Sequence, residues 1–138
     1  MNAKRILLAE TGALFFIGSL LYPILELTVR GYTHFSMGVL GGICLVAIRW
    51  VDRVLGRVRT VWKAAASAVI ITQLEWICGL LVNRLWNLRV WDYSRRAWNL
   101  EGQICPLFSF FWFLLSFGAI LAFHRIERLY RKHAASAR

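Results

Sequence analysis

Residues 104–124 read ICPLFSFFWFLLSFGAILAFH and contain no Asp, Glu, Lys or Arg. An α-helix rises about 1.5 Å per residue, so a helix of this length crosses the roughly 30 Å hydrocarbon core of a bilayer. Backbone polar groups find no water there, and a helix satisfies them within its own segment. This stretch therefore predicts a transmembrane helix, which decides the class of fold.

Three further apolar segments, residues 6–27, 37–51 and 61–82, have the same character. The second is short, and we expect it to extend back towards Tyr32. The whole chain is 59% hydrophobic and only 17% charged, more apolar than a soluble domain of this size. We therefore predict an all-α membrane protein, a single domain over residues 1–138. A cleaved signal peptide is the alternative for the first segment, but no small-x-small site precedes Tyr22.

The basic residues predict the orientation of these helices. Twelve of the seventeen Lys and Arg residues lie at the two ends of the chain or around the loop at 52–60. By the positive-inside rule, both termini and this loop are expected in the cytoplasm, with a basic tail at 125–138. The net charge of +10 thus indicates topology and attraction to anionic lipid rather than nucleic-acid binding.

An internal repeat is suggested by two short segments. Residues 32–44 align without gaps to residues 93–105, pairing Tyr32 with Tyr93 and Cys44 with Cys105. We therefore predict two tandem helix pairs related by a pseudo-two-fold axis along the membrane normal. A chance match of short segments is the alternative.

Glu75 is the most unusual residue of the apolar segments. A carboxylate within a spanning helix costs at least a few kcal/mol, so it is retained when it is paired, lines a cavity or has a function. The same helical face contains Thr72, Gly79 and Asn83 at spacings of three or four residues, a stripe of polar and small side chains. We expect this face to point into the bundle.

Tyr22, Glu26 and Arg30 are spaced four residues apart, so they share one face of the first helix. Glutamate four residues before arginine is the favourable order for a helical ion pair. The two side chains could merely neutralise each other, or they could belong to a binding site. Glu10, near the cytoplasmic end of this helix, is expected to be structural.

The loop at 83–103 is richer in polar groups than a connector requires. Asp92 and Asn99 can satisfy backbone donors in turns. They could also join the buried charges in an outward-facing polar pocket between the helices. The residues that we expect to bind a ligand there are Glu26, Arg30, Glu75, Asn83, Asp92, Tyr93, Asn99 and Gln103.

Other chemistry is not indicated. Cys44, Cys78 and Cys105 show no C-x-x-C spacing and are expected to be packing residues. No metal-ligand spacing and no G-x-S-x-G nucleophile motif occurs, so we expect neither a metal nor a cofactor, and a catalytic role is not favoured. Two small-x-x-x-small steps, Gly38 to Gly42 and Gly118 to Ala122, predict close helix packing.

Several of these residues together resemble the CmpB-type ABC-transporter permease family, from about residue 15 to 120. They are Tyr22-Pro23-x-x-Glu26, Arg30-Gly31-Tyr32-Thr33-His34-x-Ser36-Met37, Leu74-Glu75, Trp91-Asp92-Tyr93-Ser94 and Asn99-Leu100-x-Gly102-Gln103-Ile104-Cys105. The resemblance implies a bacterial membrane location and a transporter-like role, with no substrate or catalytic residue. The sequence contains no Walker A loop, so a transporter of this class would need a separate ATPase subunit.

The sequence thus leads to three functional hypotheses. The first is a permease-like component of the cytoplasmic membrane, acting as a homodimer or larger assembly because four helices are few to enclose a path. The second is a structural or regulatory subunit in which the buried charges only fix helix register. The third is an intramembrane enzyme acting on a lipid-linked substrate, with Glu75 or Asp92 as base.

Overall fold

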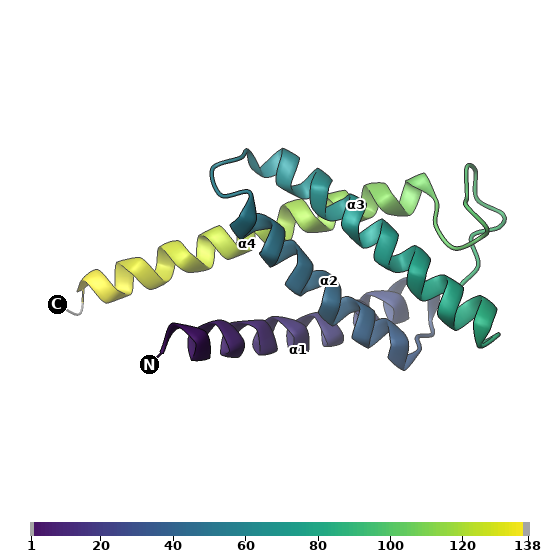
Figure 1. The fold of residues 1–138 in the computed structure, drawn as a ribbon, viewed down its shortest axis with the longest axis horizontal. Helices are drawn as coiled ribbons and strands as arrows, with labels where there is room; N and C mark the ends of the chain where they lie inside the picture. The colour runs from purple at the N-terminus through teal and green to yellow at the C-terminus, as the bar shows by residue number, and fades with distance from the viewer. Residues whose placement is uncertain (1, 137–138) are drawn as a thin grey trace.

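The computed structural model describes residues 2–136, which form an antiparallel arrangement of four helices (Figure 1). In chain order these are α1 (Ala3–Arg30), α2 (Phe35–Val54), α3 (Thr60–Gly79), which continues as the π-helix η1 (Leu80–Leu85), and α4 (Pro106–Ser136). Each of the four helical segments in the described part of the chain is long and apolar enough to cross a membrane. The prediction of an all-α, four-helix membrane protein is confirmed.

The helix ends follow from local chemistry. The Asn2 side chain accepts a hydrogen bond from the backbone N–H of Lys4 and caps α1, and Gly31 ends this helix in the left-handed conformation at φ 75°. His34 Nδ1 accepts from the backbone N–H of Ser36 at the start of α2. Pro106 begins α4, at a position where its missing N–H is not needed.

α4 extends beyond the segment that the sequence predicts as a membrane span. The helix does not end near residue 124 but continues to Ser136, through the basic stretch expected as a tail. Hydropathy detects only the apolar part, whereas the residues after His124 are good helix formers without Gly or Pro. Its 31 residues correspond to about 46 Å, longer than the hydrocarbon core.

α1 packs mainly against α2, α3 packs against α4, and α2 contacts α3. Glycines permit the closest contact: a Cβ added at Gly41 would collide with the carbonyl oxygen of Gly18 and with the side chain of Tyr22. The core is centred on Met37, Ile71 and Ile120, which are fully buried. The two-fold relation between the helix pairs remains a prediction.

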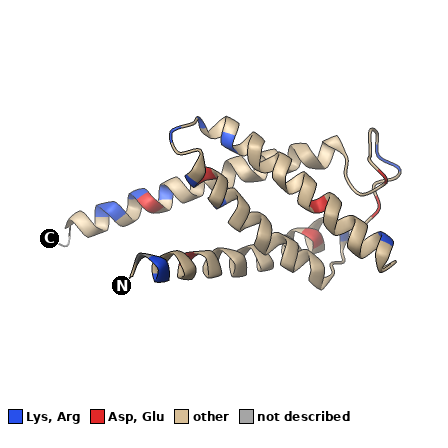
Figure 2. Ribbon diagram, viewed as in Figure 1, with Lys and Arg blue, Asp and Glu red and all other residues tan. Residues whose placement is uncertain are grey.

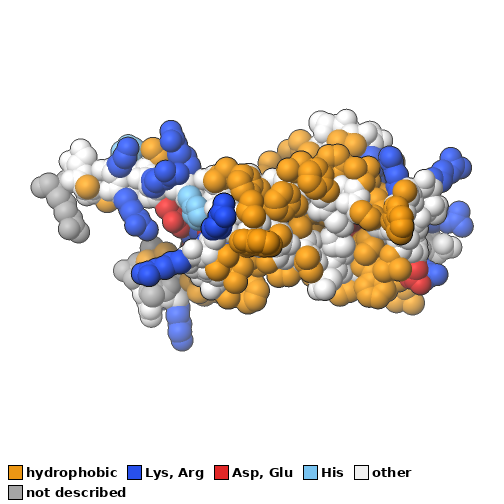
Figure 3. All heavy atoms as spheres, turned by 90° about the horizontal axis from the view of Figure 1, so that it is seen from above, with side chains coloured by type: hydrophobic (Ala, Val, Ile, Leu, Met, Phe, Trp, Pro, Cys, Tyr) orange, Lys and Arg blue, Asp and Glu red, His pale blue; other side chains and the backbone are white. Residues whose placement is uncertain are grey.

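Both termini lie at one end of the molecule, and the loop between η1 and α4 lies at the other (Figure 1). On the face seen in Figure 3, hydrophobic side chains cover the middle, while Lys and Arg gather towards the two ends. Figure 2 shows acidic residues on α1 and α3 in the half of the molecule away from the termini. Glu26 lies four residues before the last residue of α1, and Glu75 lies four residues before the last residue of α3.

Candidate functional site

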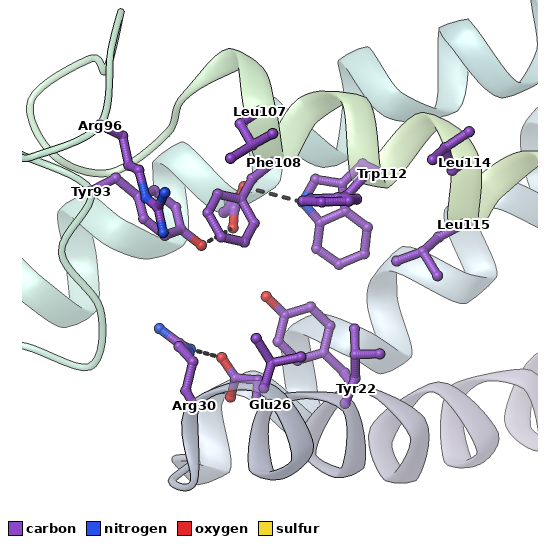
Figure 4. A pocket seen from close by; sticks show the side chains of 14 residues that line it. Tyr22, Glu26, Arg30, Tyr93, Arg96, Leu107, Phe108, Trp112, Leu114 and Leu115 are labelled. Carbon is purple, nitrogen blue, oxygen red and sulfur yellow. Dashed lines mark hydrogen bonds and ion pairs between the residues drawn. The ribbon is translucent and has the colours of Figure 1, made fainter.

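A cavity of about 580 Å³ lies between α1 and α4, and it also reaches α3 and the loop before α4 (Figure 4). Its walls are largely apolar and include Leu25, Val29, Leu107, Phe108, Phe111, Trp112, Leu114 and Leu115. Its polar lining consists of Tyr22, Glu26, Arg30, Glu75, Tyr93 and Arg96. The pocket is thus mainly hydrophobic, with four charged side chains in its lining.

α1 contributes one polar row to this cavity. Tyr22, Glu26 and Arg30 all line it, which confirms that their four-residue spacing places them on one face. Arg30 forms an ion pair with Glu26, and its guanidinium lies 5.2 Å from the centre of the Tyr32 ring. Thr33 Oγ1 donates to Glu26 Oε2 at 2.7 Å. The charge of Glu26 is therefore balanced within the same helix.

Glu75 on α3 is only 2% exposed, and its carboxylate is held by two neutral donors. The Tyr93 hydroxyl lies 3.3 Å from Oε1, and the Trp112 indole nitrogen lies 3.2 Å from Oε2. Among the residues that the structure describes, no Lys, Arg or His forms an ion pair with Glu75. The prediction that this helix face points into the bundle is confirmed, and its carboxylate lines the pocket.

Two stacked aromatic pairs stand beside this carboxylate. Tyr22 of α1 stacks on Trp112 of α4 with ring centres 5.3 Å apart and an interplanar angle of 18°. Tyr93 of the loop stacks on Phe108 with ring centres 4.4 Å apart and an angle of 12°. One member of each pair donates to Glu75, so the rings and the carboxylate form one cluster.

Burial raises the pKa of the Tyr93 phenol, and the nearby Glu75 carboxylate raises this pKa further because a phenolate would be a second negative charge. Tyr93 consequently keeps its proton near neutral pH. The neutral hydroxyl is the form that can donate to Glu75, and it lies 3.3 Å from Oε1.

The other loop residues expected at the site hold the loop instead. Asn83 Nδ2 donates to the Trp91 carbonyl at 3.0 Å and to Gln103 Oε1 at 2.8 Å, and Asn83 Oδ1 accepts from Val90 N at 2.7 Å. The Trp91 indole in turn donates to the Gln103 carbonyl. Asn83 and Gln103 are buried, and this network fixes the segment that carries Tyr93.

Asp92 and Asn99 lie in turns on the outer side of the loop. Asp92 is exposed and accepts from the backbone N–H and the hydroxyl of Ser94, bonds that lower the pKa of its carboxyl. Asn99 donates to the carbonyls of Ser94 and Arg96 and accepts from Gly102 N. Four of the eight expected site residues, Glu26, Arg30, Glu75 and Tyr93, thus meet in the cavity, and the other four do not line it.

Tyr22, Arg96, Phe108 and Trp112 are cavity residues that we did not assign to the site from the sequence. Tyr22 could have been assigned to the site from the sequence, because its spacing of four residues from Glu26 places both side chains on one face of the helix. Nothing in the sequence distinguishes Trp112 from the aromatic residues beside it on α4, because its partner Glu75 is 37 residues away.

A second group of charges joins all four helices near the end that carries the termini (Figure 2). Asp52 of α2 is its centre, with Lys63 Nζ of α3 at 2.7 Å, His124 Nε2 of α4 at 3.0 Å and Arg49 Nη1 at 3.1 Å. Arg49 also pairs with Glu10 of α1 and Glu127 of α4. Glu10 is thus bonded within the bundle, as expected for a structural residue.

The described residues contain no group of three His, Cys, Asp or Glu side chains that could hold a metal ion. Fold and site together define a multi-pass, four-helix membrane protein with a cavity that opens between its first and last helices.

The chain belongs to the family described as Putative ABC-transporter type IV, whose model matches residues 13–137. The CmpB-type resemblance is therefore confirmed. A search of the curated proteins and a search of the solved structures found no match to this chain.

Proposed function

We propose that this protein is the membrane-spanning component of a transport system of the ABC class, and that the cavity between α1 and α4 binds the transported solute. The observation that carries this proposal is the convergence of four residues on one cavity from α1, α3 and the loop before α4, namely Glu26, Arg30, Glu75 and Tyr93. Buried charges in a spanning segment are characteristic of substrate and ion pathways. The cavity volume of about 580 Å³ falls within the range of small-molecule sites.

In this proposal the protein spans the cytoplasmic membrane, and both termini and the α2–α3 turn lie in the cytoplasm. Supporting it are the basic residues at these positions, among them Lys4, Arg57, Arg59, Arg125 and Lys132. The cavity would then face the outer side of the membrane. The basic end of α4 would lie beside anionic headgroups.

The proposal includes two partners. An ABC-class system needs an ATPase, and because this chain has no Walker A loop that subunit would be separate. A second copy of the chain would help to enclose a path, since four helices leave the cavity open between α1 and α4.

A pair of matched substitutions tests the role of the cavity. Val29→Trp adds bulk at a residue that lines the cavity, whereas Val69→Trp makes the same change on α3 outside it. Both valines are exposed, Val29 by 70% and Val69 by 59%, so the two variants differ mainly in their position relative to the cavity. In a deletion strain of the source organism, solute levels in cells and medium are compared after complementation. We expect the wild type and Val69→Trp to restore the distribution and Val29→Trp to fail. Full complementation by Val29→Trp at normal membrane levels would overturn the proposal.

The charge group around Asp52 favours a second candidate, a structural or regulatory subunit. It links α1, α2, α3 and α4 without lining the cavity, as expected for charges that fix helix register. Affinity capture in mild detergent distinguishes this role. A stoichiometric partner retained by the Val29→Trp variant, together with normal complementation, would favour the subunit over the transporter component.

A further inference from the structure

The Glu75 carboxylate lacks a positive partner. Its two hydrogen bonds come from the neutral donors Tyr93 and Trp112, and no cation of the described residues lies within ion-pair distance. Neutral donors compensate only part of the desolvation of a carboxylate that is 2% exposed. A ligand that brings a positive charge into the cavity would supply the missing interaction.

The aromatic pairs around Glu75 suit the same charge. A cation is attracted to the face of an aromatic ring within about 6 Å of its centre, and cages of aromatic side chains recognise quaternary ammonium ligands in this way. Tyr22 with Trp112 and Tyr93 with Phe108 provide four rings next to one carboxylate. Anions would meet the negative ring faces and Glu75 together.

The apolar walls indicate the rest of the ligand. Beyond the charged cluster the cavity follows Leu25, Leu114 and Leu115. A second cavity of about 340 Å³, between α1, α2 and α4, shares Tyr22 and Trp112 with the first. A molecule bound here would therefore place most of its surface against hydrocarbon side chains.

The two arginines of the cavity do not reverse this preference. Arg30 is paired with Glu26, so its charge is already balanced. Arg96 belongs to the exposed loop, where water and salt screen its charge. Glu75 is buried, and charges act more strongly on a ligand where the local dielectric is low.

From these observations, and resting on the proposed function, we infer that the solute is an amphipathic organic cation whose positive group binds against Glu75 between the two aromatic pairs, with its apolar body along α1 and α4. The inference concerns the chemical class of the ligand. It is independent of the direction of transport.

Two ions of nearly the same shape and opposite charge test the inference. Labelled tetraphenylphosphonium and labelled tetraphenylborate are measured separately for displaceable binding to the full-length chain in nanodiscs of zwitterionic lipid, with empty nanodiscs subtracted. We expect the phosphonium to bind at least about tenfold more tightly, the factor that corresponds to about 1.4 kcal/mol. This comparison uses the wild-type protein, so it does not depend on whether a variant folds.

Three substitutions then locate the binding. Glu75→Gln, nearly isosteric, is expected to weaken phosphonium binding at least about tenfold. Val29→Trp is expected to abolish it. Glu101→Gln, the same change at an exposed residue outside the cavity, is expected to leave it unchanged. Circular dichroism and the melting temperature in the nanodisc establish that each variant is folded.

The outcomes separate this inference from the proposed function. Equal or tighter binding of tetraphenylborate that Val29→Trp removes would overturn the cationic class and leave the cavity as the binding site. Phosphonium binding that persists in Val29→Trp, or that a folded Glu75→Gln retains in full, would overturn the inference. The transport role itself is decided separately, by whether Val29→Trp complements the deletion strain.

Discussion

The indole nitrogen of Trp112 on α4 lies 3.2 Å from Oε2 of Glu75 on α3, so two neighbouring helices are joined by a buried hydrogen bond to a carboxylate. The bond gives a buried oxygen of Glu75 a partner, and a buried acceptor left without one destabilises the fold. The same indole stacks on Tyr22 of α1, which places one aromatic side chain in contact with both sides of the cavity.

Trp112→Phe removes the donor while keeping an aromatic ring. We expect the free energy of unfolding to fall by about 1–3 kcal/mol, since Glu75 would then have one donor left. Denaturation in mixed micelles followed by circular dichroism measures this loss. Trp98→Phe is the matched control because Trp98 is 89% exposed and should change stability little. Equal midpoints for both variants would contradict a stabilising role of the bond.

The Asp52–Lys63 pair leads to an asymmetric prediction. Asp52→Asn leaves Lys63, which is 3% exposed, without a negative partner, and we expect a loss of about 3–5 kcal/mol. Lys63→Met should be clearly less harmful, since Asp52 keeps His124 and Arg49. The double variant should recover part of the loss of Asp52→Asn, because no charged lysine then remains.

The same micelle denaturation measures these variants. Glu101→Gln is the reference, because it breaks the exposed pair with Arg84 and should change stability by less than about 1 kcal/mol. Equal losses from Asp52→Asn and Lys63→Met would show that the additional partners of Asp52 do not contribute.

Local interactions were the part of the structure that could be predicted from the sequence. The four spans follow from the apolar character of their own residues, and the Glu26–Arg30 pair follows from a four-residue spacing within one helix. The inward orientation of Glu75 follows from the high free energy of a carboxylate in lipid. Each of these features is determined by residues within a single segment of the chain.

Interactions between distant segments could not be predicted in this way. Asn83, Asp92, Asn99 and Gln103 look like ligand-binding groups in the sequence, but the structure uses their hydrogen bonds within the loop. The sequence around a polar side chain does not indicate whether that side chain will form a hydrogen bond with a backbone group or with a solute. Asp52 is a similar case, because its partners Lys63 and His124 lie 11 and 72 residues away in the sequence.

Asn83→Ala should loosen the loop that carries Tyr93. The substitution removes three hydrogen bonds, to Val90, Trp91 and Gln103, each contributing about 0.5–1.5 kcal/mol. We expect the backbone amide of Val90 to exchange its hydrogen at least about tenfold faster. Arg84→Ala, which removes an exposed ion pair with Glu101 and no buried hydrogen bond, is the control. Unchanged protection at Val90 would show that Asn83 does not fasten this loop.

Glycine substitutions distinguish Gly41, which lies inside the Gly38 to Gly42 step on α2, from Gly118, which begins the Gly118 to Ala122 step on α4. Gly41 contacts α1 so closely that a Cβ there would collide with the Gly18 carbonyl, whereas a Cβ at Gly118 would meet nothing within 4 Å. We therefore expect Gly41→Ala to lower the free energy of unfolding by about 1–3 kcal/mol, because the two helices must move apart. Gly118→Ala should be neutral or slightly stabilising, since alanine favours the helix. Denaturation of both variants in mixed micelles measures these changes in stability. An unchanged free energy of unfolding for Gly41→Ala would show that α1 and α2 are not held at this close separation.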